Sequence, residues 1–141
     1  MKKIVVIDGQ GGRIGAQLIS ELRCEIEKSQ KTIFAEITAV GTNSLATAAM
    51  LKSAPDNGAT GENPVVVACK DADILIGPIG ITVADSLYGE VTPKMAVAVG
   101  QSPARRLLIP VNKCDSEVIG AGSFTLGELI SATVKRVLEL L

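Results

Sequence analysis

The sequence has no histidine and very few aromatic residues. Its 141 residues include no His and no Trp, one Tyr and two Phe. The absence of histidine removes Ser–His and Cys–His nucleophilic pairs and the commonest general base. Any catalysis would therefore have to use Asp, Glu, Lys, Cys or a bound metal. With so few rings, a bound nucleobase would pack against Ile and Val side chains rather than stack on aromatic ones.

The sequence also has no large excess of positive or negative charge and no long apolar run at its start, and it contains only three cysteines. A net charge of −1 leaves no basic surface for nucleic acid or an anionic membrane, so we expect neither as a partner. The apolar run after Lys3 ends at Ile7, too short for a signal peptide or a transmembrane span. Cys24, Cys69 and Cys114 are odd in number, scattered and without a histidine. This pattern favours reduced thiols in a cytoplasmic protein and argues against a disulfide framework or a metal site.

The most informative stretch runs from residue 4 to residue 15, IVVIDGQGGRIG. The apolar run is followed by Asp8 and four glycines, Gly9, Gly11, Gly12 and Gly15, and then by apolar residues at helical spacing. This order predicts a buried strand, a tight loop and a helix. Glycine permits positive φ and lets backbone N–H groups approach a ligand, and a helix N-terminus favours an anion. The loop therefore predicts a phosphate site.

Strand patterns alternate with helical patterns along the rest of the chain. We expect strands at 4–7, 32–40, 73–76, 94–99 and 106–109, an edge strand at 118–119, and a loop at 54–63. Helices are expected at 13–29, 45–53, 64–69, 82–88 and 124–141, with turn and N-cap residues at 41–44. The pattern predicts one α/β domain over residues 1–141, with three layers and a mostly parallel sheet. The expected strand order is 2-1-3-4-5, because the strand at 73–76 should return beside the first strand.

The candidate site lies where the parallel strands end. In open α/β sheets, ligands bind at the carboxyl edge, at the point where the strand order reverses. Ser44, Ser102 and Asn112 also fall at predicted strand ends. The main candidates are Asp8, Gly9, Gln10, Gly11, Gly12, Arg13, Gly15, Thr42, Asn43, Gly77, Gly80 and Gln101.

Several of these features have a structural interpretation beside the functional one. The glycine loop could be a sharp turn that packs the helix on the sheet, and Arg13 a solvated surface side chain. Asp8 could hold Mg²⁺ beside a phosphate, but we favour a carboxylate that accepts loop N–H groups and fixes the loop's shape. The stretch Gly58–Asn63 could be a second phosphate or ribose loop or only a solvated connection, and Cys114 is better explained as a core thiol.

The opening segment resembles that of Rossmann-type dinucleotide-binding domains, which carry G-x-G-x-x-G after the first strand. Here a one-residue insertion, giving G-x-G-x-x-x-G, accommodates Gly9, Gly11 and Gly15. The acidic residue that such domains place after strand two is replaced by Thr42 and Asn43. The resemblance implies a Rossmann-like architecture, while this departure and the lack of a substrate domain argue against a dehydrogenase.

Nearly the whole chain also resembles a bacterial domain-of-unknown-function family of small Rossmann-like α/β proteins. The segments that carry this resemblance are 6–12, 58–63, 73–80, 98–102 and 109–112. The resemblance implies no reaction, because none is assigned to the family.

Three functions remain open at this point. The first is a module that binds a nucleotide or another phosphorylated small molecule at the glycine loop, and the sequence names no cofactor. The second is a structural or assembly subunit without a ligand. The third is a metal-assisted phosphohydrolase or transferase that uses Asp8. The mean hydropathy of +0.36 and the low net charge also predict a homodimer.

Overall fold

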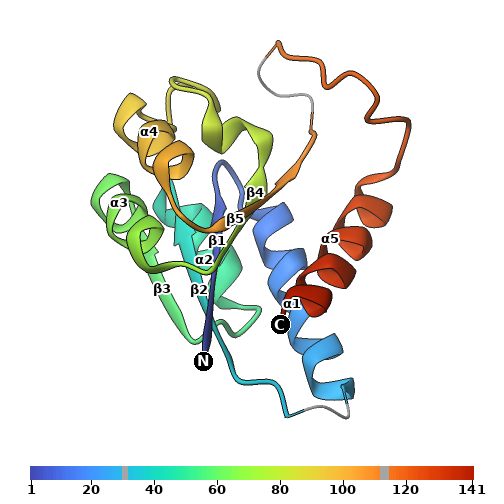
Figure 1. Ribbon diagram of the computed structural model, residues 1–141. Coiled ribbons are helices and arrows are strands. Elements are labelled where there is room, and N and C mark those ends of the chain that lie inside the picture. Colours follow the sequence, from blue (N-terminus) through green and yellow to red (C-terminus); the bar gives the residue numbers. More distant parts are fainter. Residues whose placement is uncertain (30–31, 112–114) are drawn as a thin grey trace.

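A five-stranded parallel sheet forms the centre of the computed structural model, which describes residues 1–29, 32–111 and 115–141 (Figure 1). The strands are β1 Lys2–Asp8, β2 Ala35–Gly41, β3 Asn57–Thr60, β4 Ile74–Pro78 and β5 Arg105–Ile109, in the order β3-β2-β1-β4-β5. The helices are α1 Arg13–Lys28, α2 Ser44–Leu51, α3 Glu62–Asp71, α4 Pro93–Gln101 and α5 Leu126–Leu140, with a short 3₁₀ turn, η1, at Ile79–Thr82. Every strand pair is parallel.

Helices cover both faces of the sheet. On β1, Ile4 and Val6 pack with α1, α2 and α5, whereas Val5 and Ile7 pack with α3 and α4 on the opposite face. A strand that is apolar on both sides is typical of a parallel sheet between two helical layers. The predicted single-sheet, three-layer α/β fold is therefore confirmed, and so is the placement of the strand at 73–76 beside β1.

Two elements differ from the sequence-based prediction. The segment 94–99, expected to be the fourth strand, lies inside α4, where Thr92 caps the helix and Pro93 occupies its first turn. The segment 57–60, expected to lie in a loop, forms the edge strand β3 beside β2. Five strands remain, but their order in chain numbering is 3-2-1-4-5 instead of 2-1-3-4-5.

Smaller differences concern the connections. The helix expected at 82–88 is absent beyond η1, and residues 118–119 form no strand. The final helix begins at Leu126 instead of residue 124. Asn112 and Cys114 lie outside the described residues. None of the helices formed by the described residues is long and apolar enough to cross a membrane.

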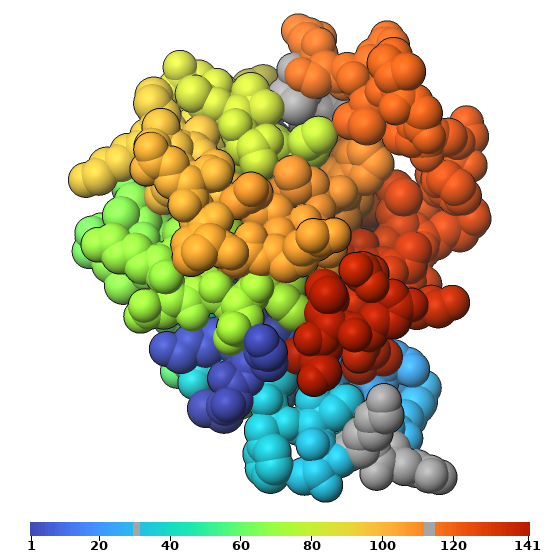
Figure 2. All heavy atoms as spheres, in the orientation of Figure 1, coloured from blue at the N-terminus to red at the C-terminus, as the bar shows by residue number. Residues whose placement is uncertain are grey.

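Two connections surround the carboxyl edge of the sheet. We call residues 83–91, between η1 and α4, the strap, and residues 115–125, before α5, the arm. Figure 1 shows both at the same end of the molecule as the loop that follows β1. In Figure 2 the arm, in orange, forms a ridge that continues into α5, in red. The predicted ligand edge is thus bordered by two segments that carry no regular secondary structure.

Candidate functional site

The loop between β1 and α1 is built around the Asp8 carboxylate. Asp8 Oδ1 accepts the backbone N–H of Gly9 and Oδ2 accepts that of Gly15, both at 2.8 Å. The residue is only 4% exposed. The expectation that this carboxylate accepts N–H groups of the loop is therefore confirmed.

Burial also determines the titration of Asp8. Desolvation raises the pKa of its carboxyl above the ordinary value, and the negative charge of Glu90 adds to this increase. The N–H groups of Gly15 and Gly9 act in the opposite direction, because they stabilise the ionised form. The net result of these effects is a raised pKa for Asp8.

The glycines of the loop serve different purposes. Gly12 has φ +70°, and a Cβ there would lie 2.5 Å from the carbonyl oxygen of Ala46, so this glycine lets α1 approach the backbone of α2. A Cβ on Gly15 would instead overlap a side chain, that of Met50 in α2. At Gly11, by contrast, the nearest atom to a Cβ would be Arg13 Cγ at 4.0 Å. Gly11 is thus the loop glycine whose backbone is open to a ligand.

A cavity of about 320 Å³ lies beside this open part of the loop. Its walls are Asp8–Ile14, Pro78 from β4, Leu87 from the strap, Val111 and Leu126. The cavity lies between the ends of β1 and β4, where the chain order of the strands reverses and ligands bind in open α/β sheets. It falls near the lower end of the range of about 300–1,000 Å³ for small-molecule sites.

Two backbone donors at this cavity remain available. In the part of the chain that the structure describes, the N–H groups of Gly11 and Arg13 have no hydrogen-bond acceptor. Arg13 is exposed, and its guanidinium has no ion-pair partner within the described ranges. Helix α1 has no acidic residue in its first turn. The described residues of the site therefore present two available N–H groups and one positive charge.

Beyond the loop, toward β2, three donors converge on one oxygen of Glu90. Glu90 Oε1 accepts the N–H of Gln10 at 2.9 Å, the hydroxyl of Thr42 at 2.8 Å and the amide of Asn43. Asn43 also donates to the carbonyl oxygen of Gln10 and accepts the N–H of Ala46, which caps α2. Thr42 and Asn43, predicted as ligand contacts, are thus engaged in holding the loop and the strap together.

Glu90 is a site residue that the sequence analysis did not identify. It places a carboxylate next to the end of β2, where the sequence itself has Thr42 and Asn43. Burial acts to raise the pKa of Glu90, but the three donors prevail and hold it below the ordinary value, so Glu90 stays ionised. Only the spatial contact reveals it, since Gln10 and Glu90 are 80 residues apart in the chain.

The sequence matches the model of a protein family described as domain of unknown function DUF3842, over residues 3–141. The chain belongs to this family. No curated protein and no solved structure matches it. Because the family's description states no reaction, the function of this DUF3842 protein has to be argued from the site.

Of the remaining predicted residues of this DUF3842 protein, two lie at the predicted edge of the sheet and one does not. Gly77 is buried in β4 against the carbonyl oxygen of Ile7, and Gly80 accepts the hydroxyl of Ser86 with its carbonyl oxygen, which anchors the strap. Both lie at the predicted edge, but their roles here are packing and anchoring.

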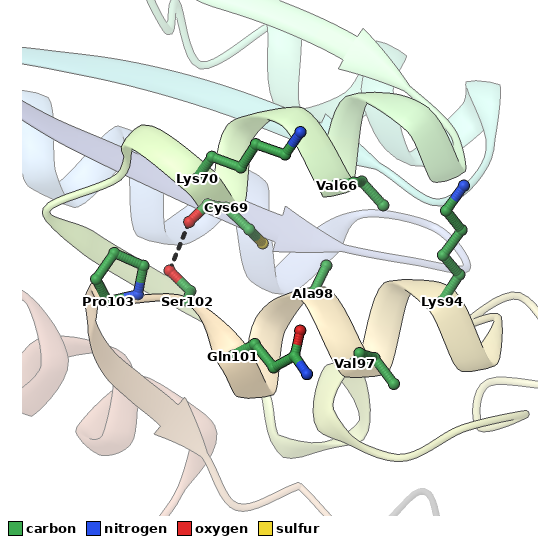
Figure 3. A pocket seen from close by; sticks show the side chains of 9 residues that line it. All are labelled: Val66, Cys69, Lys70, Lys94, Val97, Ala98, Gln101, Ser102 and Pro103. Atoms are coloured by element: carbon green, nitrogen blue, oxygen red, sulfur yellow. Dashed lines mark hydrogen bonds between the residues drawn. The ribbon is translucent and has the colours of Figure 1, made fainter.

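Gln101 lies elsewhere. It is the last residue of α4 and lines a separate cavity of about 460 Å³ between α3 and α4. Figure 3 shows this cavity with the hydrogen bond from Ser102 to the carbonyl oxygen of Cys69. Because Arg105 pairs with Ile74 at the start of β4, this end of α4 belongs to the amino edge of the sheet. The reasoning that placed Gln101 at the site was wrong because it took 94–99 for a strand.

The stretch Gly58–Asn63 forms β3 and the start of α3. Thr60 shares a 2.6 Å hydrogen bond with Thr47 of α2, and Glu62 accepts the hydroxyl of Thr92 at 2.6 Å. Neither this stretch nor any other part of the described chain contains a cluster of three or more His, Cys, Asp or Glu residues able to hold a metal ion.

Proposed function

We propose that this protein binds a nucleotide or another phosphorylated small molecule, with the phosphate over Gly11 and Arg13. The observation that carries the proposal is the pair of unpartnered N–H groups at the open end of α1, beside the Arg13 side chain and the 320 Å³ cavity. Backbone N–H groups at a helix N-terminus favour an anion through both hydrogen bonding and the helix dipole.

The number of charges at the site limits the kind of phosphate compound. Among the described residues that line the cavity, Arg13 is the one with a cationic side chain, and the carboxylates of Asp8 and Glu90 lie against the same loop. A triphosphate would meet more negative than positive charge. A compound with one phosphate group fits better.

The alternative of a phosphohydrolase using Asp8 has less support. Both oxygens of Asp8 accept backbone N–H groups of the loop. A divalent cation would have to compete with these bonds for a carboxylate that is only 4% exposed, and coordinating it would weaken the loop that holds the phosphate donors. We therefore assign Asp8 a positioning role.

A thermal-shift series tests the proposal. The probes are inorganic phosphate, ribose 5-phosphate, AMP and ATP, each with and without Mg²⁺. A ligand that binds only the folded state raises the free energy of unfolding by about 2.7 kcal/mol at 100 times Kd. The midpoint of thermal unfolding therefore rises as the ligand concentration increases. We expect a saturable rise with AMP or ribose 5-phosphate. No response to any of the four would contradict the proposal.

Two variants locate the binding. Gly11→Val places a branched side chain over the open N–H groups, and Arg13→Gln removes the charge; both should reduce the shift. Arg105→Gln on β5 is the matched control, because Arg105 is exposed and distant from the cavity residues. If all three variants responded like the wild type, the phosphate would not lie over this loop.

Assembly is the second candidate function, and the arm favours it. Ile119 is 90% exposed and Phe124 60% exposed, and both lie on this one segment. We propose that the arm contributes to a homodimer. We also propose that the protein is cytoplasmic, in line with the free thiols Cys24 and Cys69. Light scattering should give twice the monomer mass, and Phe124→Ser should lower it; a wild-type monomer at micromolar concentration would contradict the dimer.

A further inference from the structure

The cavity of about 460 Å³ between α3 and α4, which we call the α3–α4 cavity, is apolar and positively charged. Figure 3 shows Val66, Val97 and Ala98 between the side chains of Lys70 and Lys94. Among the described residues, no Asp or Glu lines this cavity, and neither lysine makes an ion pair. Val97 is 52% exposed. The cavity therefore suits an occupant that is both apolar and acidic.

The arm presents an apolar side chain at the tip of a tight turn. Ala121 donates its N–H to the carbonyl oxygen of Val118 at 3.2 Å, and Gly120 has φ +83°. A positive φ at the third residue is what a type II turn requires, and glycine adopts it readily. Ile119 lies between them and is 90% exposed. The turn thus holds Ile119 outward in a shape that is already formed.

The chain around this turn is acidic. Asp115 and Glu117 precede the turn, and both are exposed. Within the described ranges, neither carboxylate has an ion-pair partner. The sequence contains no Lys or Arg from residue 115 to residue 134. The arm therefore combines exposed apolar surface with negative charge, which is the complement of the α3–α4 cavity.

The charge of the α3–α4 cavity distinguishes it from two other cavities of the described surface. The cavity between α1 and α5 has Glu21 and Glu25 beside its lysines. The cavity beside β2 and α3 is lined by Glu36 and Asp71 as well as by a lysine. An acidic segment would meet like charges in both of these places. The α3–α4 cavity is the better receptor for the arm.

The arm and the α3–α4 cavity of one chain lie on different sides of the sheet. The arm leads into α5, which packs on the same face as α1, whereas α3 and α4 pack on the opposite face (Figure 1). The occupant of the cavity is therefore sought in a second copy. Lys94 lies in the first turn of α4, close behind the strap, so this end of the cavity borders the same edge of the sheet as the arm. Two copies can then exchange arms around a two-fold axis.

We propose that the Val118–Ala121 turn binds in the α3–α4 cavity of a second copy of this chain. Ile119 provides the apolar contact, and the carboxylates of Asp115 and Glu117 face the two lysines of the cavity. Burial of the apolar tip supplies affinity, while the opposite charges fix the orientation. This inference rests on the homodimer proposed above and names the surface that receives the arm.

Sedimentation equilibrium of the wild type and three variants tests this contact. Ile119→Ser removes the apolar tip, and Lys70→Glu/Lys94→Glu reverses the charge of the cavity; each should raise the Kd of the dimer about tenfold or more. Lys52→Glu/Lys135→Glu is the control with the same change in net charge, because both lysines are exposed and lie outside the α3–α4 cavity. The control should weaken the dimer much less.

A charge exchange tests whether the two surfaces touch directly. Asp115→Lys/Glu117→Lys should weaken the dimer alone and should restore it when combined in one chain with Lys70→Glu/Lys94→Glu, because the ion pairs form again with reversed polarity. All the substituted residues are exposed, so the fold should persist.

The same arm variant combined with the control pair Lys52→Glu/Lys135→Glu has the same net charge and should not recover. A monomeric wild type would contradict the proposed homodimer and this inference with it. A wild-type dimer that the cavity and control variants weaken equally, or that the charge exchange fails to restore, would overturn this inference alone.

Discussion

Adjacent glycines in the loop should respond very differently to the same substitution. Gly12 has φ +70°, and its Cβ position lies 2.5 Å from the carbonyl oxygen and 2.7 Å from the Cα of Ala46. Both atoms are backbone, so they cannot turn aside as a flexible side chain would. Gly11 lacks the positive φ and has open space at its Cβ position.

The magnitudes follow from these two environments. In Gly12→Ala, the left-handed backbone costs roughly 1–2 kcal/mol and the overlap with α2 roughly 1–3 kcal/mol. The free energy of unfolding should therefore fall by about 2–5 kcal/mol. In Gly11→Ala neither cost applies, and the lower entropy of the unfolded chain should leave stability unchanged or raise it by up to about 1 kcal/mol.

Urea denaturation followed by circular dichroism measures both changes. With a slope of about 2 kcal/mol per molar urea, the midpoint of Gly12→Ala should fall by at least about 1 M relative to Gly11→Ala. The same result explains why Gly12 is unsuited as a probe of ligand access: its substitution disturbs the packing of α1 on α2. If the free energy of unfolding of Gly12→Ala were within about 0.5 kcal/mol of the wild-type value, the assignment of this glycine to helix packing would be refuted.

Three further predictions concern single residues. Asp8→Asn should lower the free energy of unfolding by about 1–3 kcal/mol in the same assay, because its amide can accept only one of the N–H groups of Gly9 and Gly15; an unchanged stability would show that these bonds do not hold the loop. The pKa of Glu90 is lowered in the folded state, so its contribution to stability is present above the ordinary value of 4.5 and is lost as the pH falls through the lowered value. Glu90→Gln should therefore lose less stability than the wild type between about pH 5 and pH 3, and parallel pH profiles would contradict this. Gly100→Ala, in α4 with nothing within 4 Å of its Cβ position, should raise stability by about 0.5–1 kcal/mol, and a destabilised variant would place Gly100 in a contact that the structure lacks.

Most of the fold could be predicted from patterns that local physics dictates. The apolar run of β1 and the helical spacing of α1 and α5 gave the right element types, since each buries a face that its sequence makes apolar. The segment 94–99 was misassigned because Met-Ala-Val-Ala-Val alternates like a strand. Its helical signals were the cap Thr92, Pro93 in the first turn, and the buried pair Met95 and Val99, one helical turn apart.

The edge strand β3 carries almost no signal of its own. Its residues Asn57-Gly58-Ala59-Thr60 include a glycine and only one β-branched side chain, and most of them are exposed. Pairing with β2 creates this strand, so its existence depends on a neighbour rather than on propensity. A tertiary contact of this kind is not visible in the local sequence.

The candidate site was predictable only in part for the same reason. The glycine loop and Arg13 follow directly from the sequence around β1 and line one cavity. Glu90 and the roles of Thr42 and Asn43 depend on the strap crossing to β2, which no spacing in the chain indicates. The sequence also does not distinguish two of the adjacent candidates: in the structure Gly11 is open, whereas Gly12 is packed against α2.

The central claim is that a phosphate compound lies over Gly11 and Arg13. The most direct test is to titrate the ¹⁵N-labelled protein with AMP and follow the backbone amide signals of every residue. The account predicts saturable shifts that are largest for the N–H groups of Gly11 and Arg13, with smaller shifts at Gln10 and Leu87. Saturable shifts centred on the α3–α4 cavity at Val97 and Gln101, with the loop signals unmoved, would contradict it.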